Sequence, residues 1–167
     1  LALRREPGRT ALSYARTLFN LNRFEESYEL AKYYNENYPS DAQGLSFLAD
    51  AARALNKPGV EYDLQRLTKI DSANTYAWSS LAQYYYDQGD FAMAIPIYDR
   101  MLREKLNVTP EMRYEYALCQ LQVGLWSDAL PNLDQAVREG IKDKYPPHLA
   151  QTVKQIIAGS FKEDALN

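Results

Sequence analysis

The sequence predicts an all-α protein, and three observations support that prediction. Hydrophobic residues make up 46% of its 167 residues, enough for a folded core. Fourteen tyrosines stand against only seven glycines, a balance that favours packed helices over a turn-rich β-sandwich. Apolar residues also recur at gaps of three and four, as at Trp78, Leu81, Ala82 and Tyr85. That spacing is typical of the apolar stripe of an amphipathic helix.

The same pattern recurs along the chain with a period of 33 to 35 residues. Adding 35 takes Gly89 to Gly124, subtracting 33 takes Leu81 to Leu48, and a further 34 reaches Tyr14. Each unit has two apolar stripes, so each is expected to form two helices. The four expected units are about residues 8–40, 41–74, 75–108 and 109–142.

Each unit has turn and packing signals between its two expected helices. Gly89 supplies the backbone freedom that ends the first helix, and Asp90 is expected to cap the second by accepting bonds from its free amides. Asn22 occupies the place of Gly89 in the first unit. Ala82 and Ala94, one in each helix, are expected to let the two backbones approach closely.

Two features interrupt the regular repeat. The second unit is one residue shorter between its helices, and the missing residue falls in the segment 56–59. Pro96 and Pro131 lie at the same place in two successive second helices, where each removes a backbone hydrogen bond and should bend the helix.

A further helix is expected after the fourth unit, at about residues 146–158. Prolines suit its first turn, Leu149, Val153 and Ile156 form one apolar stripe, and Gly159 is expected to end it. We interpret it as a capping helix that covers the last unit, because the packing face of that unit would otherwise meet water. The alternative is the first helix of a fifth unit.

The pattern W-x-x-L-A-x-x-Y-x-x-x-G-x-F-x-x-A-x-x-x-Y across residues 78–98 resembles the tetratricopeptide repeat. This resemblance implies a right-handed α-solenoid of antiparallel helix pairs, formed as a single array over residues 1–167. Pentatricopeptide repeats have a similar length. The sequence from Gly89 to Ala94 and the acidic charge balance argue against that RNA-binding relative.

Charge and composition exclude several classes of partner and site. A net charge of -3 gives little attraction to nucleic-acid phosphates. No apolar run approaches the roughly 18 to 20 residues of a membrane span, so membrane insertion is not expected. Cys119 and His148 are the only cysteine and histidine, too few for a zinc cage. The sequence does not indicate a cellular compartment.

No catalytic site or cofactor is expected. Cys119 lies between Leu118 and Leu121 without a polarising partner, so we interpret it as a small buried side chain rather than a nucleophile. The sequence also lacks a glycine-rich phosphate loop. Neither an enzyme activity nor a metal site is predicted.

The resemblance implies a concave groove, lined by the first helices of successive units, that receives a peptide or a helix of a partner. Aromatic side chains are the expected anchors, because tyrosine combines wide apolar contact with an orienting hydroxyl. The residues assigned to the groove are Arg9, Arg16, Phe19, Asn20, Asp50, Arg53, Tyr76, Gln83, Tyr86, Asp87, Tyr114 and Glu115. On the same faces lie Leu12, Gln43, Ser46, Ser79, Glu111, Leu118 and Gln122.

Two functions fit these expectations. The first is a non-catalytic scaffold or adaptor that binds a partner segment in the groove, with the acidic end of that segment near Arg16 and its basic end near Glu115. The alternative is a structural spacer or self-association module that works through the ends of the array. The set of side chains with which related repeats grip a C-terminal carboxylate is incomplete in this sequence.

Overall fold

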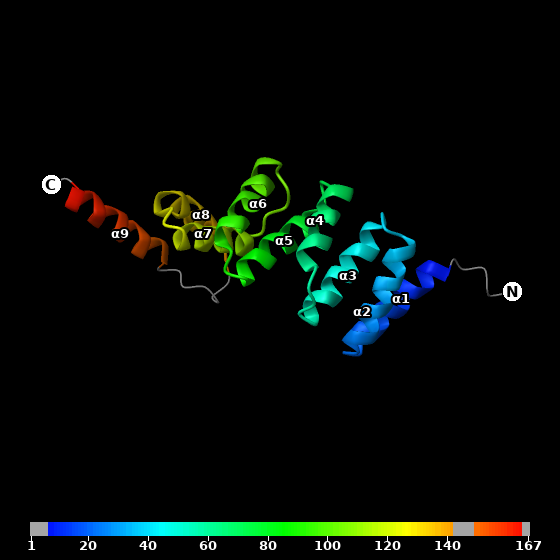
Figure 1. Ribbon diagram of the computed structural model, residues 1–167. Helices are drawn as coiled ribbons and strands as arrows, with labels where there is room; N and C mark the ends of the chain where they lie inside the picture. The colour runs from blue at the N-terminus through cyan, green and yellow to red at the C-terminus, as the bar shows by residue number, and fades with distance from the viewer. Residues whose placement is uncertain (1–6, 142–148, 165–167) are drawn as a thin grey trace. The chain divides into compact units, whose positions relative to one another are not determined.

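The computed structural model describes residues 7–141 and 149–164, with the side chains of 8, 10–141 and 149–159. These residues form nine helices and no strand, which confirms the predicted all-α class (Figure 1). The helices are α1 (Pro7–Asn20), α2 (Phe24–Asn37), α3 (Ala42–Ala54), α4 (Val60–Ile70), α5 (Thr75–Asp87), α6 (Phe91–Arg103), α7 (Pro110–Gln122), α8 (Trp126–Arg138) and α9 (Leu149–Asp164).

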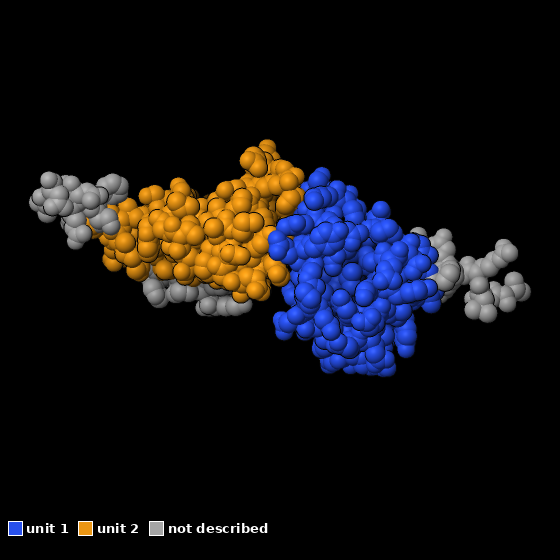
Figure 2. Space-filling view, viewed as in Figure 1, with its two compact units in different colours: residues 1–77 blue, residues 78–167 orange. Residues whose placement is uncertain are grey.

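The chain divides into two compact units, residues 1–77 and 78–167, whose boundary falls inside α5 (Figure 2). In unit 1, α2 contacts both α1 and α3, and α3 contacts α4. In unit 2, α7 contacts both α6 and α8, and α8 contacts α9. Each helix therefore packs mainly on its neighbours in sequence, as expected of a helical repeat protein.

A residue with positive φ closes the first helix of each repeat. The φ angles are 59° at Asn22, 77° at Gly89 and 82° at Gly124, at the three matching places. Asn56, the equivalent residue of the second repeat, has φ 51°. Asparagine and glycine tolerate this left-handed conformation, which turns the chain into the second helix.

The shortened second repeat changes the start of its second helix. α4 begins only at Val60, which is equivalent to Ala94, the fourth residue of α6. Gly59 precedes it with φ 95°, so the segment 56–59 has two left-handed residues instead of one. As a result, α4 has 11 residues where α6 has 13.

The predicted cap at Asp90 is wrong. Asp90 stands directly before α6, but its side chain makes no capping hydrogen bond there. Its backbone carbonyl instead accepts from the amides of Met93 and Ala94, at 2.9 and 3.1 Å. Side-chain caps occur before the first helices: the Thr109 hydroxyl accepts from the Met112 amide at 3.3 Å at the start of α7.

Small buried residues bring the two helices of the first repeat together. Ala15 of α1 and Ser27 of α2 are both fully buried. The Ser27 hydroxyl donates to the Ala15 carbonyl across the helix pair, at 2.9 Å. Ala82 and Ala94, the equivalent residues of the third repeat, are fully buried as well. A larger side chain at these places would force the backbones apart.

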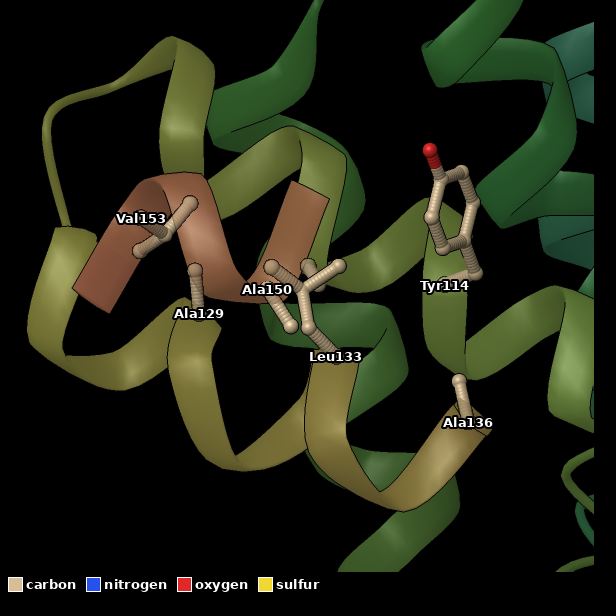
Figure 3. Packing of buried hydrophobic residues seen from close by; sticks show 7 residues of the cluster. Tyr114, Ala129, Leu133, Ala136, Ala150 and Val153 are labelled. Atoms are coloured by element: carbon tan, nitrogen blue, oxygen red, sulfur yellow. The ribbon is translucent and has the colours of Figure 1, made fainter. Parts of the chain in front are cut away.

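The core of unit 2 extends from α7 through α8 to α9. Figure 3 shows Ala150 and Val153 of α9 next to Ala129 and Leu133 of α8. Leu133 and Val153 are only 1% exposed. α9 therefore covers an apolar face of the fourth repeat, which is the place that the sequence assigned to a capping helix.

The last helix is longer than the sequence suggested. α9 runs through Gly159 to Asp164, so this glycine does not end it. The expected beginning of that helix, residues 146–148 with His148, lies outside the described residues. Within the described part of the chain, no helix combines the length and apolarity that a membrane crossing requires.

Candidate functional site

The first helices of unit 1 line a hollow of about 360 Å³, which we call the inner hollow. Its lining is Arg16 and Asn20 of α1, Gln43, Ser46, Phe47 and Asp50 of α3, and Tyr76 in the first turn of α5. On α3 these residues follow the spacing i, i+3, i+4 and i+7, so one face of the helix supplies them all. The core residue Leu45 lies on the opposite side and is fully buried.

Asp50 is already engaged by other side chains of unit 1. Its carboxylate accepts a hydrogen bond from the Tyr76 hydroxyl and one from Arg53 Nη2, the latter at 3.2 Å. The Tyr76 bond ties the first turn of α5 to α3. Because Arg53 compensates the charge of Asp50, the cationic character of the hollow comes from Arg16 on its other side.

Aromatic rings form part of the same face. The Arg16 guanidinium carbon lies 5.9 Å from the centre of the Phe47 ring, within the range of a cation–π contact. Phe47 packs edge-on against Phe19 at 5.7 Å, and Phe19 packs in the same way against Phe24 at 5.0 Å. These contacts fix the rings before any ligand arrives, which lowers the entropy cost of binding.

A second hollow of about 690 Å³ adjoins the first, because Arg16 and Gln43 line both. Its remaining lining residues are Leu12, Ser13, Tyr34, Tyr38, Asp41 and Ala42. Tyr34 and Tyr38 stack with their ring centres 4.9 Å apart, and the Tyr34 hydroxyl donates to Asp41. The two hollows together form a polar, tyrosine-rich surface along α1 and α3.

The structure brings four of the seven residues that the sequence assigned to the groove in unit 1 into one place. Arg16, Asn20, Asp50 and Tyr76 line the inner hollow. Phe19 and Arg53 contact that lining from beside it, as described above. The side chain of Arg9, the remaining residue assigned to unit 1, lies outside the described side chains.

In unit 2, three of the assigned residues contact other side chains of this unit. Gln83 donates to Asp87 at 2.8 Å, one helical turn away on α5. Tyr86 is half-buried, with its ring edge-on to that of Phe91 at 5.7 Å. Gln83, Tyr86 and Asp87 therefore each contact another side chain of unit 2, and any binding role at the surface would come in addition to that contact.

Tyr114 does not lie on an open face, which corrects its assignment as a groove anchor. Its side chain is 5% exposed and belongs to the core cluster with Ala117, Leu133 and Ala136 (Figure 3). Tyr114 thus has a packing role in α7.

Glu115 also has an internal role. Its carboxylate accepts a hydrogen bond from the hydroxyl of Tyr98, which is 1% exposed, at 3.2 Å. On the same helix, the Tyr116 hydroxyl donates to Asp99 of α6, and the rings of Tyr98 and Tyr116 lie 5.5 Å apart. These contacts join α6 to α7, so Glu115 stabilises a repeat interface.

Two tyrosines and the cysteine of this interface are held in their neutral forms. Burial, reinforced by nearby Glu115, raises the pKa of Tyr98 well above its usual value. Burial and the bond to Asp99 raise the pKa of Tyr116 in the same direction. Burial also raises the pKa of the Cys119 thiol to about 12. At neutral pH Cys119 is therefore a thiol, not the thiolate that a nucleophile requires.

Phe47 is the lining residue that sequence reasoning missed. The signal was present, because Phe47 lies four residues after Gln43 and one after Ser46, both assigned to the inner face of α3. Tyr34, Tyr38 and Asp41 could not be found in this way. These residues lie in the last turn of α2 or between α2 and α3. The resemblance places only the first helices of the units in a groove.

Metal binding finds no support in the side chains that the structure describes. Among them, no group of three or more His, Cys, Asp or Glu residues is placed to hold an ion. The chemistry available in the inner hollow consists of hydrogen bonding, one guanidinium group and aromatic contact.

Comparison with known proteins adds one family match. The model of the family described as anaphase-promoting complex, cyclosome, subunit 3 matches residues 64–136, less than half of the chain. A search of curated proteins gives no match.

Solved structures with a similar fold cover most of the chain. A MamA structure from Desulfovibrio magneticus RS-1 has a TM-score of 0.79 at 11% identity, over 98% of this chain and 98% of that one. MamA AMB-1 has a TM-score of 0.72 at 13% identity, over 95% and 82%. YrrB, described as a TPR protein with an unusual peptide-binding site, has a TM-score of 0.72 at 15% identity, over 87% and 76%. The chain therefore has the tetratricopeptide-repeat fold that its residues resemble.

Proposed function

We propose that the chain is a non-catalytic scaffold that binds a peptide or helical segment of another protein in the inner hollow. The observation that supports this most is the composition of the hollow, in which a guanidinium group and side-chain amides stand beside two aromatic rings. Such a surface offers hydrogen bonds for orientation and apolar area for affinity. The likeness of fold to YrrB, whose description includes a peptide-binding site, is consistent with it.

The charges of the hollow favour an acidic group in the bound segment. Arg16 presents its guanidinium beside Phe47, whereas Asp50 is compensated by Arg53. A carboxylate of the ligand is therefore expected near Arg16, and an apolar side chain of the ligand near Phe47 and Tyr76.

Selection from a displayed library of random peptides tests this proposal without a known partner. The full chain is the bait, and selected peptides are then measured against the double variant Arg16→Ala, Gln43→Ala. Loss of two hollow-lining groups should weaken binding at least about tenfold, equivalent to about 1.4 kcal/mol. The matched control is Lys32→Ala with Gln151→Ala, two exposed helix positions outside the lining.

Each outcome of that selection is informative. Peptides that carry Asp or Glu, bind the control and lose affinity for the hollow variant would support the proposal. Peptides that bind both variants equally well would contradict it and move the site elsewhere on the chain. Equal urea midpoints for the two variants would show that folding is not the cause.

Self-association through an end of the repeats is the second candidate. It is favoured by Ile156, an apolar side chain of α9 that is 42% exposed. Sedimentation over a wide range of protein concentrations tests it. A mass that rises with concentration and returns to that of one chain in Ile156→Ser would support the candidate, and a constant mass would reject it.

A further inference from the structure

Two rows of polar side chains line the inner hollow and the second hollow that adjoins it. We call these two hollows together the inner strip. The rows are Ser13, Arg16 and Asn20 on α1, and Gln43, Ser46 and Asp50 on α3. Within each row, successive residues are three and four positions apart, so each row follows one face of its helix. Side chains of both helices line each hollow, so the strip has one polar wall from α1 and one from α3.

Polar walls on both sides favour a ligand whose backbone groups are unpaired. A helix bonds its own amides and carbonyls internally, and the grooves that bind amphipathic helices are mainly hydrophobic. An extended segment instead presents backbone N–H and C=O groups along both of its edges. Arg16 can donate to such carbonyls, and the side-chain amides of Asn20 and Gln43 can both donate and accept. The walls of the strip therefore match the two edges of an extended segment.

The spacing along each wall also fits an extended segment. Residues four positions apart on a helix are separated by about 6 Å along its axis, and alternate residues of an extended chain by about 6.6 Å. From Ala42 in the second hollow to Asp50 in the inner hollow, α3 rises by about 12 Å. About five extended residues span that length.

Aromatic contact is available at both ends of the strip. The second hollow includes Tyr38, which is 41% exposed, and the inner hollow includes Phe47 together with Tyr76, which is 38% exposed. Arg16 and Gln43 line both hollows, so they lie where the two meet. Along its length, the strip thus offers an aromatic ring, then a guanidinium group, then two further aromatic rings.

The charges around the strip favour an acidic residue at its middle. Both carboxylates of the lining are engaged, because Asp41 accepts from the Tyr34 hydroxyl and from the Gln43 amide, and Asp50 accepts from Arg53. Residues 4–9, whose charged side chains lie outside the described ones, contain three arginines and one glutamate. Their summed charge is therefore positive as well, and it does not oppose a carboxylate at Arg16.

We propose that the ligand of the inner strip is an extended segment of another protein with the pattern apolar–x–acidic–x–apolar, where x is any residue. This inference rests on the proposed function and adds the conformation and the residue pattern of the ligand. Alternate side chains of an extended chain point to the same face. The three patterned side chains therefore face the strip together, the acidic one at Arg16 and the apolar ones at Tyr38 and at Phe47.

Two displayed peptide libraries of equal size and peptide length test the pattern against the full chain. One fixes the proposed pattern, with the three residue classes two positions apart. The other places the same classes four and three positions apart, the spacing of one face of a helix. Selected peptides are then measured against the wild type, the variant Arg16→Ala, Gln43→Ala, and the control Lys32→Ala, Gln151→Ala.

The library with the proposed pattern is expected to be enriched over the other. Replacing the acidic residue of a selected peptide by its amide should weaken binding at least about tenfold, as should the variant Arg16→Ala, Gln43→Ala. Proline at one or the other intervening position should leave binding within about threefold, whereas a helical ligand would lose about a hundredfold at both. The peptide should shift amides of the ¹⁵N-labelled chain in both hollows, around Tyr38 and around Phe47.

The results that would overturn this inference differ from those that would overturn the proposed function. Enrichment of the helical library alone, with peptides that still require Arg16 and Gln43, would reject the extended ligand and leave the proposed function standing. Large losses with both proline replacements, or shifts confined to one hollow, would reject it in the same way. Equal binding to the variant Arg16→Ala, Gln43→Ala, or no enrichment in either library, would contradict the proposed function and this inference together.

Discussion

Two glycines of unit 1 lie directly against tyrosine rings. A Cβ atom at Gly44 would overlap the ring of Tyr34, and one at Gly8 would overlap the ring of Tyr38. Tyr34 is only 5% exposed, and its hydroxyl is bonded to Asp41, so this ring has little freedom to move aside. Close approach of α3 to the Tyr34 ring therefore requires glycine at position 44, whereas Tyr38, which faces Gly8, is 41% exposed.

The variant Gly44→Ala is expected to destabilise the protein by about 1–3 kcal/mol, because the added methyl group overpacks the contact between α3 and Tyr34. Urea titration followed by circular dichroism measures the change. The control is Gly159→Ala in α9, where nothing lies within 4 Å of the added atom. There alanine should instead stabilise the helix, by about 0.5–1 kcal/mol. Equal effects at the two sites would contradict the clash at Gly44.

Trp78 and Tyr86 test which residues of α5 belong to the core. Trp78 is 8% exposed, with the guanidinium carbon of Arg100 4.1 Å from the centre of its ring. Trp78→Ala should cost about 3–5 kcal/mol, because the truncation leaves a cavity. Tyr86→Ala should cost clearly less, because Tyr86 is only half-buried. Similar losses in urea titrations of the two variants would show that Tyr86 is a core residue.

Two second helices continue through a proline. Pro96 lies inside α6 and Pro131 inside α8, at equivalent positions, and both side chains are exposed. A proline in a helix interior lacks the amide that would bond to the carbonyl four residues earlier, and its ring crowds that carbonyl. The packed faces of α6 and α8 therefore stabilise helices that their local sequence disfavours.

Replacing either proline with alanine is expected to raise the stability of the helix that contains it. The restored backbone bond should outweigh the greater freedom of the unfolded chain and give about 2 kcal/mol for each variant. In the Pro96→Ala variant, the amides around residue 96 should exchange their hydrogens more slowly than in the wild type. The Pro131→Ala variant provides the equivalent test in α8. Unchanged exchange and unchanged stability in both variants would contradict this prediction. Tertiary packing would then already offset the missing backbone hydrogen bonds.

At the scale of the whole molecule, we expect the two compact units to differ in their response to alkaline pH. The buried groups with raised pKa values, Tyr98, Tyr116 and Cys119, all belong to unit 2. Above the ordinary pKa of each group, the unfolded state has released a proton that the folded state still holds. Their contribution to stability is therefore complete below about pH 9 and is lost as the pH rises towards 12.

The two tryptophans, Trp78 and Trp126, report on unit 2, because both belong to it. As the pH rises above about 9, tryptophan fluorescence is expected to change before half of the helical circular dichroism is lost. Tyr98→Phe should shift this transition to higher pH, since phenylalanine has no proton to release. Coincident changes of fluorescence and circular dichroism, unaffected by Tyr98→Phe, would contradict the assignment to unit 2.

The periodic pattern was sufficient to predict the helix pairs and several of their connections. The gaps of three and four residues predicted the stripes, and the positive φ angles lie where Asn22, Gly89 and Gly124 indicated. Residues 43, 46 and 50 line one hollow because a regular helix places them on one face, but their role in binding stays a prediction. The expectation of a single array over the whole chain stays a prediction.

The sequence by itself thus determined the class of fold and the repeat length, because these depend on local periodicity. Only the tertiary structure decided that Tyr114 is buried and that Tyr14 is exposed, although both are tyrosines on the first helix of a repeat. Burial depends on which neighbouring helix covers a face, and this information lies in contacts between repeats. A residue's own place in the helical period cannot supply it.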